Sequence, residues 1–472
     1  MSKVQLRIPI DIAQRLLTAL NLTGPREPVV FGLVTHARAG DEIIFLRDIR
    51  IPPETAFLPS AGHGARWSGA YMISLLNEAI SSNSGLFIFH PHGGRRVRMS
   101  GDDETSARAL LPKFELVCPA RPHGSVVVGP DSADGLITLP RQQHLVRGLS
   151  IRQFTTRILD YPLPGASMRE RLRFRGSPLL CGAISDELLH AVRIVVVGQS
   201  GGGTNASLQL AQHGVGQIFG IDDDIVEHGN LFSGLGFSED HVGRKALKVD
   251  VVSEQIRRLG SRTRYQAVRA RVPSPEAISI LKSADIIVGC VNNLHSRADL
   301  QEMALRYAIP YVDIGLILIP DGTREKSDFP PVRTISGNIF TYVPGGACMW
   351  CTEFLTDQKL SDETGGRGRP YLASLDGADA RVVSFNGVLA SQAVNEVLNL
   401  VLGFKHSDLK SAYWKFDGFS GSLTSWAIAR NIHCDRCATY LSAGDPIWME
   451  KRPRNASMED ASSVSLSVPG VQ

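Results

Sequence analysis

From Arg193 onward the chain repeats one unit, in which an apolar strand, a glycine-rich loop and a helix lead into the next strand. The first unit reads RIVVVGQSGGGT over 193–204, and a helical segment then leads to a second strand, QIFGIDDD. Strands that alternate with helices in this way pair in parallel and carry the helices on the faces of the sheet. The pattern predicts a doubly wound, Rossmann-like α/β domain, whose glycine loop lies at a helix N-terminus suited to phosphate.

The length of 472 residues predicts more than one domain. We expect a mixed α/β domain over 1–145, a linker with an N-terminal arm and helix over 146–190, the Rossmann-like domain over 191–449 and a mobile tail over 450–472. The net charge of +3 argues against nucleic acid or a membrane as partner. Seven cysteines, four of them in CxxC pairs, suit a reducing compartment, so a cytoplasmic location is expected.

Histidine and acidic residues form a regular pattern near the end of the first domain. The run HPHGGRRVRMSGDD places His90, His92, Ser100 and Asp103 in the spacing His-x-His-x7-Ser-x2-Asp. Two imidazoles and a carboxylate can hold a catalytic zinc with a fourth position open for water. Such a zinc lowers the pKa of its bound water to about 7. A lone histidine in a strand is usually structural, whereas four residues at fixed spacing predict a zinc hydrolase.

This spacing resembles the signature of the JAMM (MPN-plus) metalloproteases, which cleave isopeptide bonds to ubiquitin-like proteins. The resemblance covers roughly residues 1–145 and implies a catalytic zinc whose ligands are His90, His92 and Asp103. It further implies that Glu27, which opens EPVVFGL, accepts a proton from water and that Ser100 stabilises the oxyanion. Glu42 in the next strand is the alternative to Glu27.

The glycine loop of the second domain alone would equally fit a dinucleotide dehydrogenase. Four further runs of sequence indicate which class of protein it belongs to. The runs IDDDIVEHGNL, HVGRKALKVDVV, ADIIVGCVNNLHSR and PYVDIG occur in this order. They resemble the adenylating core of the ThiF/MoeB/ubiquitin-activating superfamily over roughly residues 165–440. The resemblance implies that the domain uses ATP and magnesium to activate the C-terminal glycine of a ubiquitin-like protein.

The same resemblance assigns roles to individual residues of the ATP site. The phosphates would be cradled by Gly198, Gly201, Gly202 and Gly203. Asp222 would bind the ribose, and Asn230 would contact phosphate. The lysine that neutralises the triphosphate falls at Lys245 or Lys248, and Lys248 is preferred because KVDVV continues best into a helix. Asn230 and Lys248 are therefore the predicted catalytic residues of this site.

Two positions depart from the pattern of the superfamily. Ser233 stands where an arginine is usual, and Asn292-Asn293 stand where Asp-Asn is usual, with the aspartate helping to hold magnesium. Both changes remove a charge near the triphosphate. We expect Asn292 to remain at the ATP site, Asp224 to supply a carboxylate, and arginines within 169–175 to supply a guanidinium from the partner subunit of a homodimer. A site that binds nucleotide but turns it over slowly is the alternative.

Two CxxC pairs indicate a second zinc site. Four thiolates form a closed tetrahedral site without an open position, and the ligands here are Cys348, Cys351, Cys434 and Cys437. ThiF/MoeB-like proteins carry a structural zinc at this place. The motif occurs twice, and Cys351 follows a tryptophan rather than opening a helix, which argues against a redox role.

The remaining cysteines offer no obvious thioester nucleophile. Ubiquitin-activating relatives use a reactive cysteine that accepts the activated carboxyl, but none lies between Asp313 and Cys348. Cys118, Cys181 and Cys290 are the others, and Cys181 in the loop-like SPLLCGA is the best candidate among them.

The two halves together predict a bifunctional enzyme, similar to the JAMM–ThiF fusions of bacterial ubiquitin-like modification operons. It would adenylate the C-terminal glycine of a ubiquitin-like protein with a Gly-Gly-type end and cleave after that glycine, with a separate conjugating enzyme as a further partner. Two alternatives stay open. The adenylate could become a thiocarboxylate, as in MoeB-type sulfur-carrier activation, with JAMM trimming. The adenylating domain could instead only bind the modifier for the peptidase.

Overall fold

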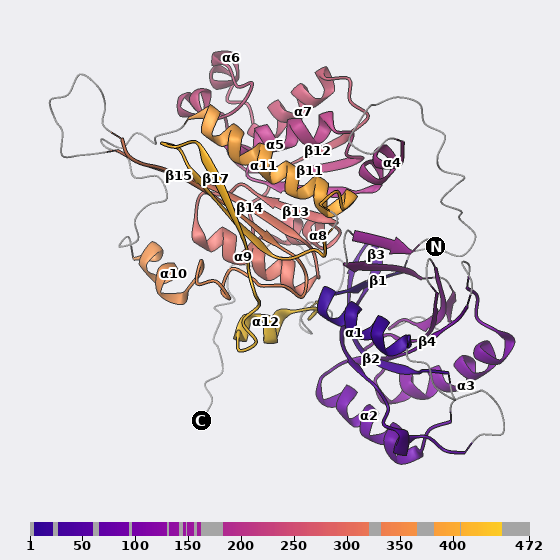
Figure 1. Ribbon diagram of the computed structural model, residues 1–472. Helices are drawn as coiled ribbons and strands as arrows, with labels where there is room; N and C mark the ends of the chain where they lie inside the picture. The colour runs from indigo at the N-terminus through magenta and orange to yellow at the C-terminus, as the bar shows by residue number, and fades with distance from the viewer. Residues whose placement is uncertain are drawn as a thin grey trace, which may run out of the picture.

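The computed structural model describes residues 4–21, 27–59, 66–93, 97–129, 132–140, 145–147, 149–154, 158–161, 183–320, 332–365, 382–405 and 407–445. These residues form two domains, each built on one sheet, which lie side by side in Figure 1.

The first domain, within the described residues, has a nine-stranded mixed sheet in the order β7-β6-β5-β4-β2-β3-β1-β8-β9. Its strands are β1 (Val4–Ile8), β2 (Val30–Ala39), β3 (Asp41–Arg50), β4 (Gly85–Pro91), β5 (His123–Val128), β6 (Ala133–Thr138), β7 (Val146–Arg147), β8 (Ser150–Phe154) and β9 (Ile158–Tyr161). Its helices are α1 (Ile10–Leu20), the 3-10 turn η1 (Glu54–Ala56), α2 (Gly69–Ser81) and α3 (Gly101–Val117).

Helices cover both faces of the first sheet. The apolar residues of α1 recur at helical spacing, and Ile12, Leu16 and Leu20 pack into one core with β1 and β3. On the other face, α2 and α3 enclose a separate core around Leu75 and Leu111. The central strand β4 is buried along nearly its whole length, so it reads as a continuous apolar run that ends at the histidine motif.

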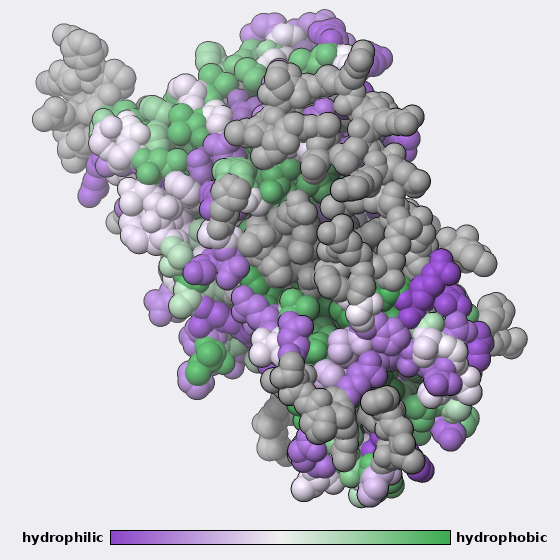
Figure 2. Space-filling model, turned by 45° about the vertical axis from the view of Figure 1, so that its right-hand side comes forward, coloured by the Kyte–Doolittle hydropathy of each residue, from purple (hydrophilic) through white to green (hydrophobic). Residues whose placement is uncertain are grey.

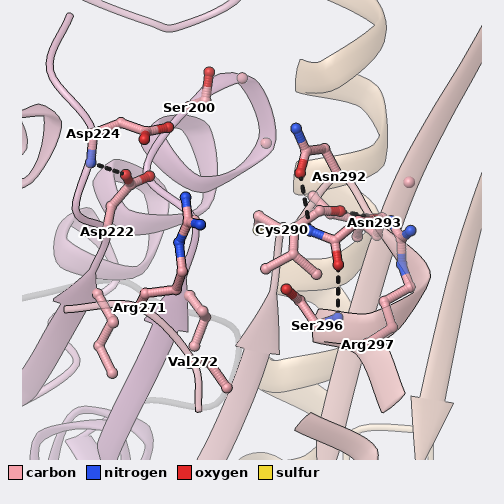
Figure 3. A pocket seen from close by; sticks show the side chains of 18 of the residues that line it. Ser200, Asp222, Asp224, Arg271, Val272, Cys290, Asn292, Asn293, Ser296 and Arg297 are labelled. Carbon is pink, nitrogen blue, oxygen red and sulfur yellow. Dashed lines mark hydrogen bonds between the residues drawn. The ribbon is translucent and has the colours of Figure 1, made fainter. Parts of the chain in front are cut away.

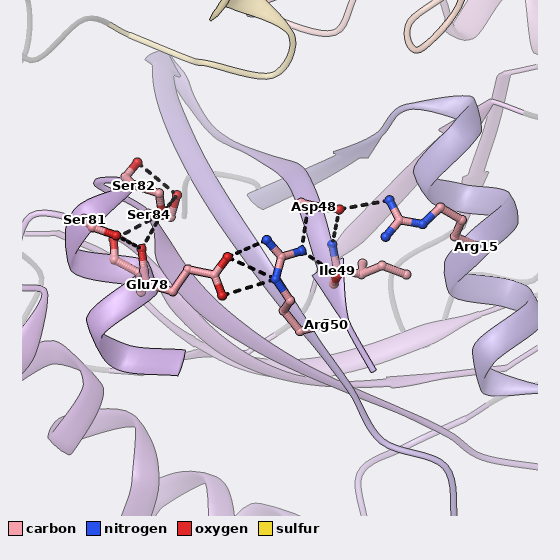
Figure 4. A network of polar contacts seen from close by, with 9 residues as sticks. Arg15, Asp48, Ile49, Arg50, Glu78, Ser81, Ser82 and Ser84 are labelled. Atoms are coloured by element: carbon pink, nitrogen blue, oxygen red, sulfur yellow. Dashed lines mark hydrogen bonds and ion pairs between the residues drawn. The ribbon is translucent and has the colours of Figure 1, made fainter. Parts of the chain in front are cut away.

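A polar network ties β3 to the helices beside it (Figure 4). The Arg50 guanidinium pairs with Glu78 of α2 and with Asp48, while Arg15 of α1 donates to Asp48 at 2.9 Å. These hydrogen bonds to Glu78 raise the pKa of Arg50. The network links α1 and α2 to each other through β3.

The second domain, within the described residues, has an eight-stranded sheet in the order β12-β11-β10-β13-β14-β15-β16-β17. Its strands are β10 (Arg193–Val197), β11 (Gln217–Ile221), β12 (Arg264–Val268), β13 (Ile286–Gly289), β14 (Tyr311–Pro320), β15 (Val332–Tyr342), β16 (Ala412–Asp417) and β17 (Ser422–Ala427). Its helices are α4 (Ala183–Ala191), α5 (Gly201–Gln212), η2 (His228–Phe232), α6 (Glu239–Gly243), α7 (Lys248–Arg258), α8 (Pro275–Lys282), α9 (Leu294–Arg306), α10 (Asp357–Thr364), α11 (Val383–Leu402) and α12 (Asp435–Tyr440).

The first five strands of this sheet are parallel, and β15 to β17 add to it antiparallel. Helices α5, α7 and α11 cover one face, and α8 and α9 cover the other (Figure 1). The chain leaves β10 for β11 on one side and later returns to β13 on the other side. This reversal of strand order opens a crevice at the carboxyl ends of β10 and β13, where such folds bind ligands. The expected Rossmann-like architecture is thereby confirmed.

The first sheet extends beyond the expected boundary at residue 145. Strands β7, β8 and β9 lie within the expected linker but belong to that sheet, and β8 pairs in parallel with β1. The pairing joins residues 4–8 to residues 150–154, which no local pattern in the sequence reveals. Residues 162–182, with the arginines at 169–175, and the tail from 450 lie outside the described residues.

The domains share a continuous core and several buried polar contacts. Phe45 of β3 packs within one apolar cluster with Tyr307 of the second domain, their ring centroids 6.1 Å apart. Arg7 of β1, only 1% exposed, donates to the carbonyls of Tyr307 at 2.8 Å and of Ala284 at 3.2 Å. At the last described residue, the Asp445 carboxylate accepts a hydrogen bond from the Tyr307 hydroxyl and forms an ion pair with Lys282. The interface between the two domains is therefore buried and packed like the core of a single domain.

Among the described residues, no helix is both long enough and apolar enough to cross a bilayer. The face drawn in Figure 2 alternates hydrophobic and hydrophilic residues over both domains.

Candidate functional site

A pocket of about 520 Å³ lies in the crevice at the carboxyl ends of β10, β11 and β13. The turn after β10 forms one wall, the acidic residues after β11 a second, and the asparagines after β13 a third. Figure 3 shows Asp222 and Asp224 on one side of the pocket and Asn292 and Asn293 on the other, with the Arg271 side chain between them in this view. A volume of this size lies within the range of about 300–1,000 Å³ that small-molecule sites occupy.

The glycine turn allows α5 to begin close against β10. Gly198 adopts φ +85°, which L side chains rarely adopt. A Cβ on Gly203 would lie 1.8 Å from the Gly198 carbonyl oxygen, so this position excludes any larger residue. Gly198, Gly201 and Gly202 line the pocket, whereas Gly203 lies behind them. The backbone N–H groups at the start of α5 therefore face the cavity, an arrangement that favours phosphate.

Asp222 fastens the glycine turn to β11. Its Oδ2 accepts the Gln199 N–H at 2.6 Å, and its Oδ1 accepts the Asp224 N–H at 2.9 Å. Burial raises the pKa of Asp222, which the positive charge of Lys248 partly offsets. Each carboxylate oxygen retains a further lone pair, so the residue can also accept a hydroxyl group from the cavity.

The structure distinguishes the two candidate lysines. Lys248 opens α7, is 6% exposed, lines the pocket and places its Nζ 2.8 Å from Asp224 Oδ2. Lys245 is exposed, adopts φ +51° and lies outside the lining. Carboxylate oxygens of Asp222, Asp223 and Asp224 lie within 4.8 Å of one another. Such hard oxygen ligands suit magnesium.

Asn230 lies behind the pocket wall rather than in it. It is 1% exposed, its Oδ1 accepts the Glu227 N–H at 2.9 Å, and its Nδ2 donates to Ser200 Oγ at 3.4 Å. Ser200 itself lines the pocket. In this structure Asn230 therefore reaches the cavity through Ser200. Ser233, at the position of the missing arginine, is buried and also lines the pocket.

Two arginines add positive charge to the lining of the pocket. Arg271 stands on the loop after β12 at the pocket, with its Nε 3.4 Å from Asp223 Oδ2, and its side chain is 76% exposed. Arg297 is fully buried and donates to Asp313 Oδ2 at 2.8 Å. Burial raises the pKa of Asp313, while Arg297 lowers it. Arg271 is thus the guanidinium that can turn toward a bound nucleotide.

The N-terminus of α9 borders the same pocket and is held by α10. Asn293 caps the helix by accepting the Ser296 N–H at 2.7 Å. The Glu363 carboxylate accepts the N–H groups of Leu294 at 2.9 Å and His295 at 3.1 Å. Helix α10 is therefore docked at the site, and residues 366–381 that follow it lie outside the described residues.

Asp299 makes the stability of the protein depend on pH. Burial raises its pKa to about 6, from 3.8, with Glu302 adding to the rise and His295 opposing it. The folded state therefore holds the proton more tightly, and its stability falls as pH rises from about 4 to 6. We expect Asp299→Asn to raise the unfolding free energy by about 1 kcal/mol at pH 7.5, after allowing for solvent screening, and to leave it nearly unchanged at pH 4.

Urea denaturation of wild type and Asp299→Asn at the two pH values measures this difference. Glu115→Gln in α3, at a partly buried carboxyl of the first domain, serves as a matched carboxyl-to-amide control. Equal stabilisation by Asp299→Asn at both pH values would contradict the assignment.

The histidine motif converges at the end of β4. His90 Nε2 lies 3.1 Å from Asp103 Oδ1, and His92 Nε2 lies 3.2 Å from Asp103 Oδ2. Each histidine therefore contacts a different oxygen of Asp103, and a zinc held by these three residues stays a prediction. Glu27 contributes an oxygen within 4.8 Å of ligand atoms of both histidines. Glu42 instead pairs with Arg38 at 3.1 Å.

Ser100 and Asp103 also have a structural role. They form the capping box of α3, in which Ser100 Oγ accepts the Asp103 N–H at 3.1 Å and Asp103 Oδ2 accepts the Ser100 N–H at 2.8 Å. His92 Nδ1 lies 3.0 Å from the Arg98 carbonyl oxygen, which assigns the proton to Nδ1 and leaves Nε2, 3.2 Å from Asp103 Oδ2, without one. The same bonds that start the helix therefore orient three of the expected zinc-site residues.

The four cysteines of the CxxC pairs meet at one point. The sulfur atoms are separated by 3.6 Å for Cys348–Cys351, 3.8 Å for Cys348–Cys434, 3.6 Å for Cys351–Cys437 and 3.4 Å for Cys348–Cys437. A tetrahedron with Zn–S bonds of about 2.3 Å has edges of about 3.8 Å. The cluster fits a structural zinc that would join the 348–351 turn to α12.

Two other cysteines lie within the described residues: Cys118 is buried, and Cys290 is partly buried and lines the pocket. Burial raises the pKa of Cys118, and burial together with the negative charge of Asp313 raises the pKa of Cys290. A thiol must ionise to act as a nucleophile, so neither is suited to form a thioester. Cys181 lies outside the described residues.

The parallel strand order, the glycine turn and the pocket at the strand-order reversal define a Rossmann-like nucleotide-binding domain. The sequence model of the ThiF family matches residues 178–437, more than half of the chain. The chain therefore belongs to the ThiF family, which confirms the expected class of the second domain. The first domain lies outside this match.

Relatives share only part of their length with this chain. The adenylyltransferase and sulfurtransferase uba4 of Aspergillus fumigatus is 32% identical over 163 residues, which cover 34% of this chain and 31% of that protein. The SAMP-activating enzyme E1 of Haloferax volcanii is 30% identical over 146 residues, 29% of this chain and 53% of that protein. A crystal structure of E. coli MccB with MccA-N7isoASN covers 54% of this chain and 69% of that chain, with 20% identity and a TM-score of 0.43.

Proposed function

We propose that the second domain uses ATP to adenylate the C-terminal carboxylate of a ubiquitin-like or sulfur-carrier protein. The observation that carries this proposal is the pocket at the strand-order reversal, with its glycine turn, aspartates and buried Lys248, in a chain of the ThiF family. A carboxylate oxygen would attack the α-phosphorus of ATP, the bond to the bridging oxygen would break, and pyrophosphate would leave.

Each group in the pocket has a role in this reaction. The N–H groups at the start of α5 would bind phosphate, and Asp222 would accept a ribose hydroxyl. Lys248 and Arg271 would neutralise the triphosphate, with Arg271 compensating for Ser233. Asp224 would offer magnesium the carboxylate that Asn292 lacks. Asn230 would act on phosphate through Ser200.

The pKa values of the cysteine thiols bear on which group accepts the activated carboxyl from the adenylate. Cys118 and Cys290 have pKa values raised by burial, which supports transfer to an acceptor other than these two cysteines. Sulfur transfer, giving a thiocarboxylate, is favoured because a similar relative is named as both adenylyltransferase and sulfurtransferase. Transfer to the thiol of a separate conjugating enzyme is the second route. A homodimer through the second domain would supply the arginines at 169–175 to the neighbouring ATP site.

The first domain supports a second proposed activity, which is hydrolysis after the same terminal glycine. His90, His92 and Asp103 would hold a zinc that makes hydroxide available at neutral pH. Glu27 would take the proton from the attacking water and pass it to the leaving amine, while Ser100 would donate to the developing oxyanion. The convergence of these side chains supports this role, which would trim a precursor or remove the modifier from a target.

ATP–pyrophosphate exchange tests the adenylation proposal. The full chain is incubated with ATP, magnesium, labelled pyrophosphate and a ubiquitin-like protein that ends in Gly-Gly. Label should enter ATP only with the intact modifier and not with the same protein lacking its last glycine. Absence of exchange with modifiers that the chain demonstrably binds and cleaves would instead support a second domain that only holds the substrate.

Glu27→Gln should abolish peptide cleavage while preserving zinc and adenylation. Loss of a positioned general base lowers hydrolysis by about 10²–10⁴-fold. The measurement is cleavage of a Gly-Gly-linked fusion, with ATP–pyrophosphate exchange assayed in parallel. Glu42→Gln is the matched control and should retain cleavage. Cleavage that survives Glu27→Gln, or exchange that is lost with it, would contradict the division of labour between the domains.

A further inference from the structure

A second cavity of about 520 Å³ lies between the two domains. The second domain contributes the amino ends of β10, β11 and β12 and the turn before β13, which form the edge of the sheet opposite to the ATP pocket. The first domain contributes β1, β8 and the β2–β3 turn. The cavity is thus a product of the domain junction, and neither domain encloses it alone.

Positive charge gathers in this cavity. Its lining holds five arginines against two aspartates, Asp41 and Asp285. The excess of three positive charges equals the formal net charge of the whole 472-residue chain. The arginines are Arg7, Arg152, Arg193, Arg262 and Arg264. Like charges held together in a cleft repel one another and favour an anion between them.

Two of these arginines are fixed in the wall. Arg7 is 1% exposed and donates to two backbone carbonyls of the second domain. Arg152 is 5% exposed and forms an ion pair with Asp285, which also accepts the Arg193 N–H at 2.7 Å. The Asp285 carboxylate is therefore already engaged on both oxygens. Burying a guanidinium group costs free energy unless its N–H groups are hydrogen-bonded. The contacts across the domain junction therefore hold both arginines in this wall.

The other three present their guanidinium groups from β10 and the start of β12. Arg193 donates to the Gln217 side chain at 3.1 Å and packs over Phe219. Arg262 and Arg264 are exposed, and the Arg264 side chain forms no hydrogen bond or ion pair with the described residues. Planar guanidinium groups bind phosphate oxygens in pairs, a geometry that ammonium groups do not provide.

We propose that this junction cavity binds a phosphorylated small molecule of nucleotide size, separately from the ATP that enters the catalytic pocket. The charge selects a phosphate anion, and the volume exceeds what a single inorganic phosphate fills. Because the walls come from both domains, the bound molecule strengthens their junction. The site does not depend on adenylation, since it lies at the opposite edge of the sheet.

Equilibrium dialysis of the full chain against labelled AMP, ATP and pyrophosphate tests the proposal. Wild type should bind two equivalents of at least one of these probes. Arg262→Ala/Arg264→Ala should weaken one equivalent by about tenfold or more, since each lost charge-assisted contact is worth about a factor of ten. Lys248→Met should weaken only the other equivalent. Arg257→Ala/Arg269→Ala removes the same charge outside both cavities and should leave both equivalents intact.

Two results would overturn the proposal. One is a single equivalent of every probe that disappears with Lys248→Met, because binding would then belong to the catalytic pocket alone. The other is equal weakening by the two arginine pairs, because the effect would then follow net charge and not the cavity. Circular dichroism and thermal midpoints of each variant establish that the substitutions, all at exposed residues of the second domain apart from Lys248, leave the fold intact.

Discussion

Lys248→Met is expected to lower ATP–pyrophosphate exchange by about 10²–10³-fold, the usual cost of removing a group that stabilises developing charge. The Lys248 ammonium is held in the pocket by Asp224 and by its place at the start of α7. Methionine keeps the length and apolar stem of the side chain but removes its charge, so the triphosphate would lose its buried counter-charge. The measurement is the initial rate of exchange at saturating modifier.

Lys245→Met is the control for this experiment, because Lys245 is exposed and outside the pocket lining. It should retain the wild-type rate within about twofold. A large loss with Lys245→Met and none with Lys248→Met would reverse the assignment. A loss with both, accompanied by a lowered thermal midpoint, would indicate damage to α7 and not to catalysis.

Cys434→Ser is expected to remove one zinc per chain and to lower the thermal midpoint by at least about 10 °C. Structural zinc sites contribute about 10–16 kcal/mol of apparent binding energy, and a loss of about 4 kcal/mol already shifts a large domain by this amount. The cluster joins the 348–351 turn to α12, and the residues that follow α12 dock onto the first domain. Loss of the metal should therefore loosen the domain junction as well.

Metal analysis and calorimetry of the same preparations measure this effect. Cys118→Ser is the matched control, since Cys118 is a buried thiol of the first domain and far from the cluster in sequence. It should keep the full zinc content. Wild type should contain two zinc ions per chain, and a variant that keeps both after Cys434→Ser would contradict the tetrathiolate site.

Much of the fold can be predicted because its patterns are local. The buried strand 193–197, the glycine turn and the acidic end of the next strand lie within 30 residues, and their order fixes the place of the pocket. The His-x-His-x7-Ser-x2-Asp spacing is local as well, since Ser100 and Asp103 form one helix cap and His90 and His92 lie at the end of one strand, but the zinc site that it predicts stays a prediction.

The remaining features depend on contacts between distant residues. The pairing of β1 with β8 joins segments that carry no shared motif, which is why 146–161 is expected as a linker and found in a sheet. Arg271 and Asp299 enter the pocket from a loop and a helix whose sequences give no functional signal. Asn230 differs from these residues, because its position in a motif predicts contact with phosphate. Its side chain instead forms hydrogen bonds with the Glu227 N–H and with Ser200 Oγ.

Arg7 and Phe45 of the first domain insert into the second domain, so the described residues of the two domains form one packed unit. The proposed zinc site and the nucleotide pocket accordingly lie on two domains that are packed against each other. Under the proposed function, a protein tail released from one of them would reach the other by diffusing away and binding again. The sequence of events on such a tail would then be set by relative concentrations and residence times.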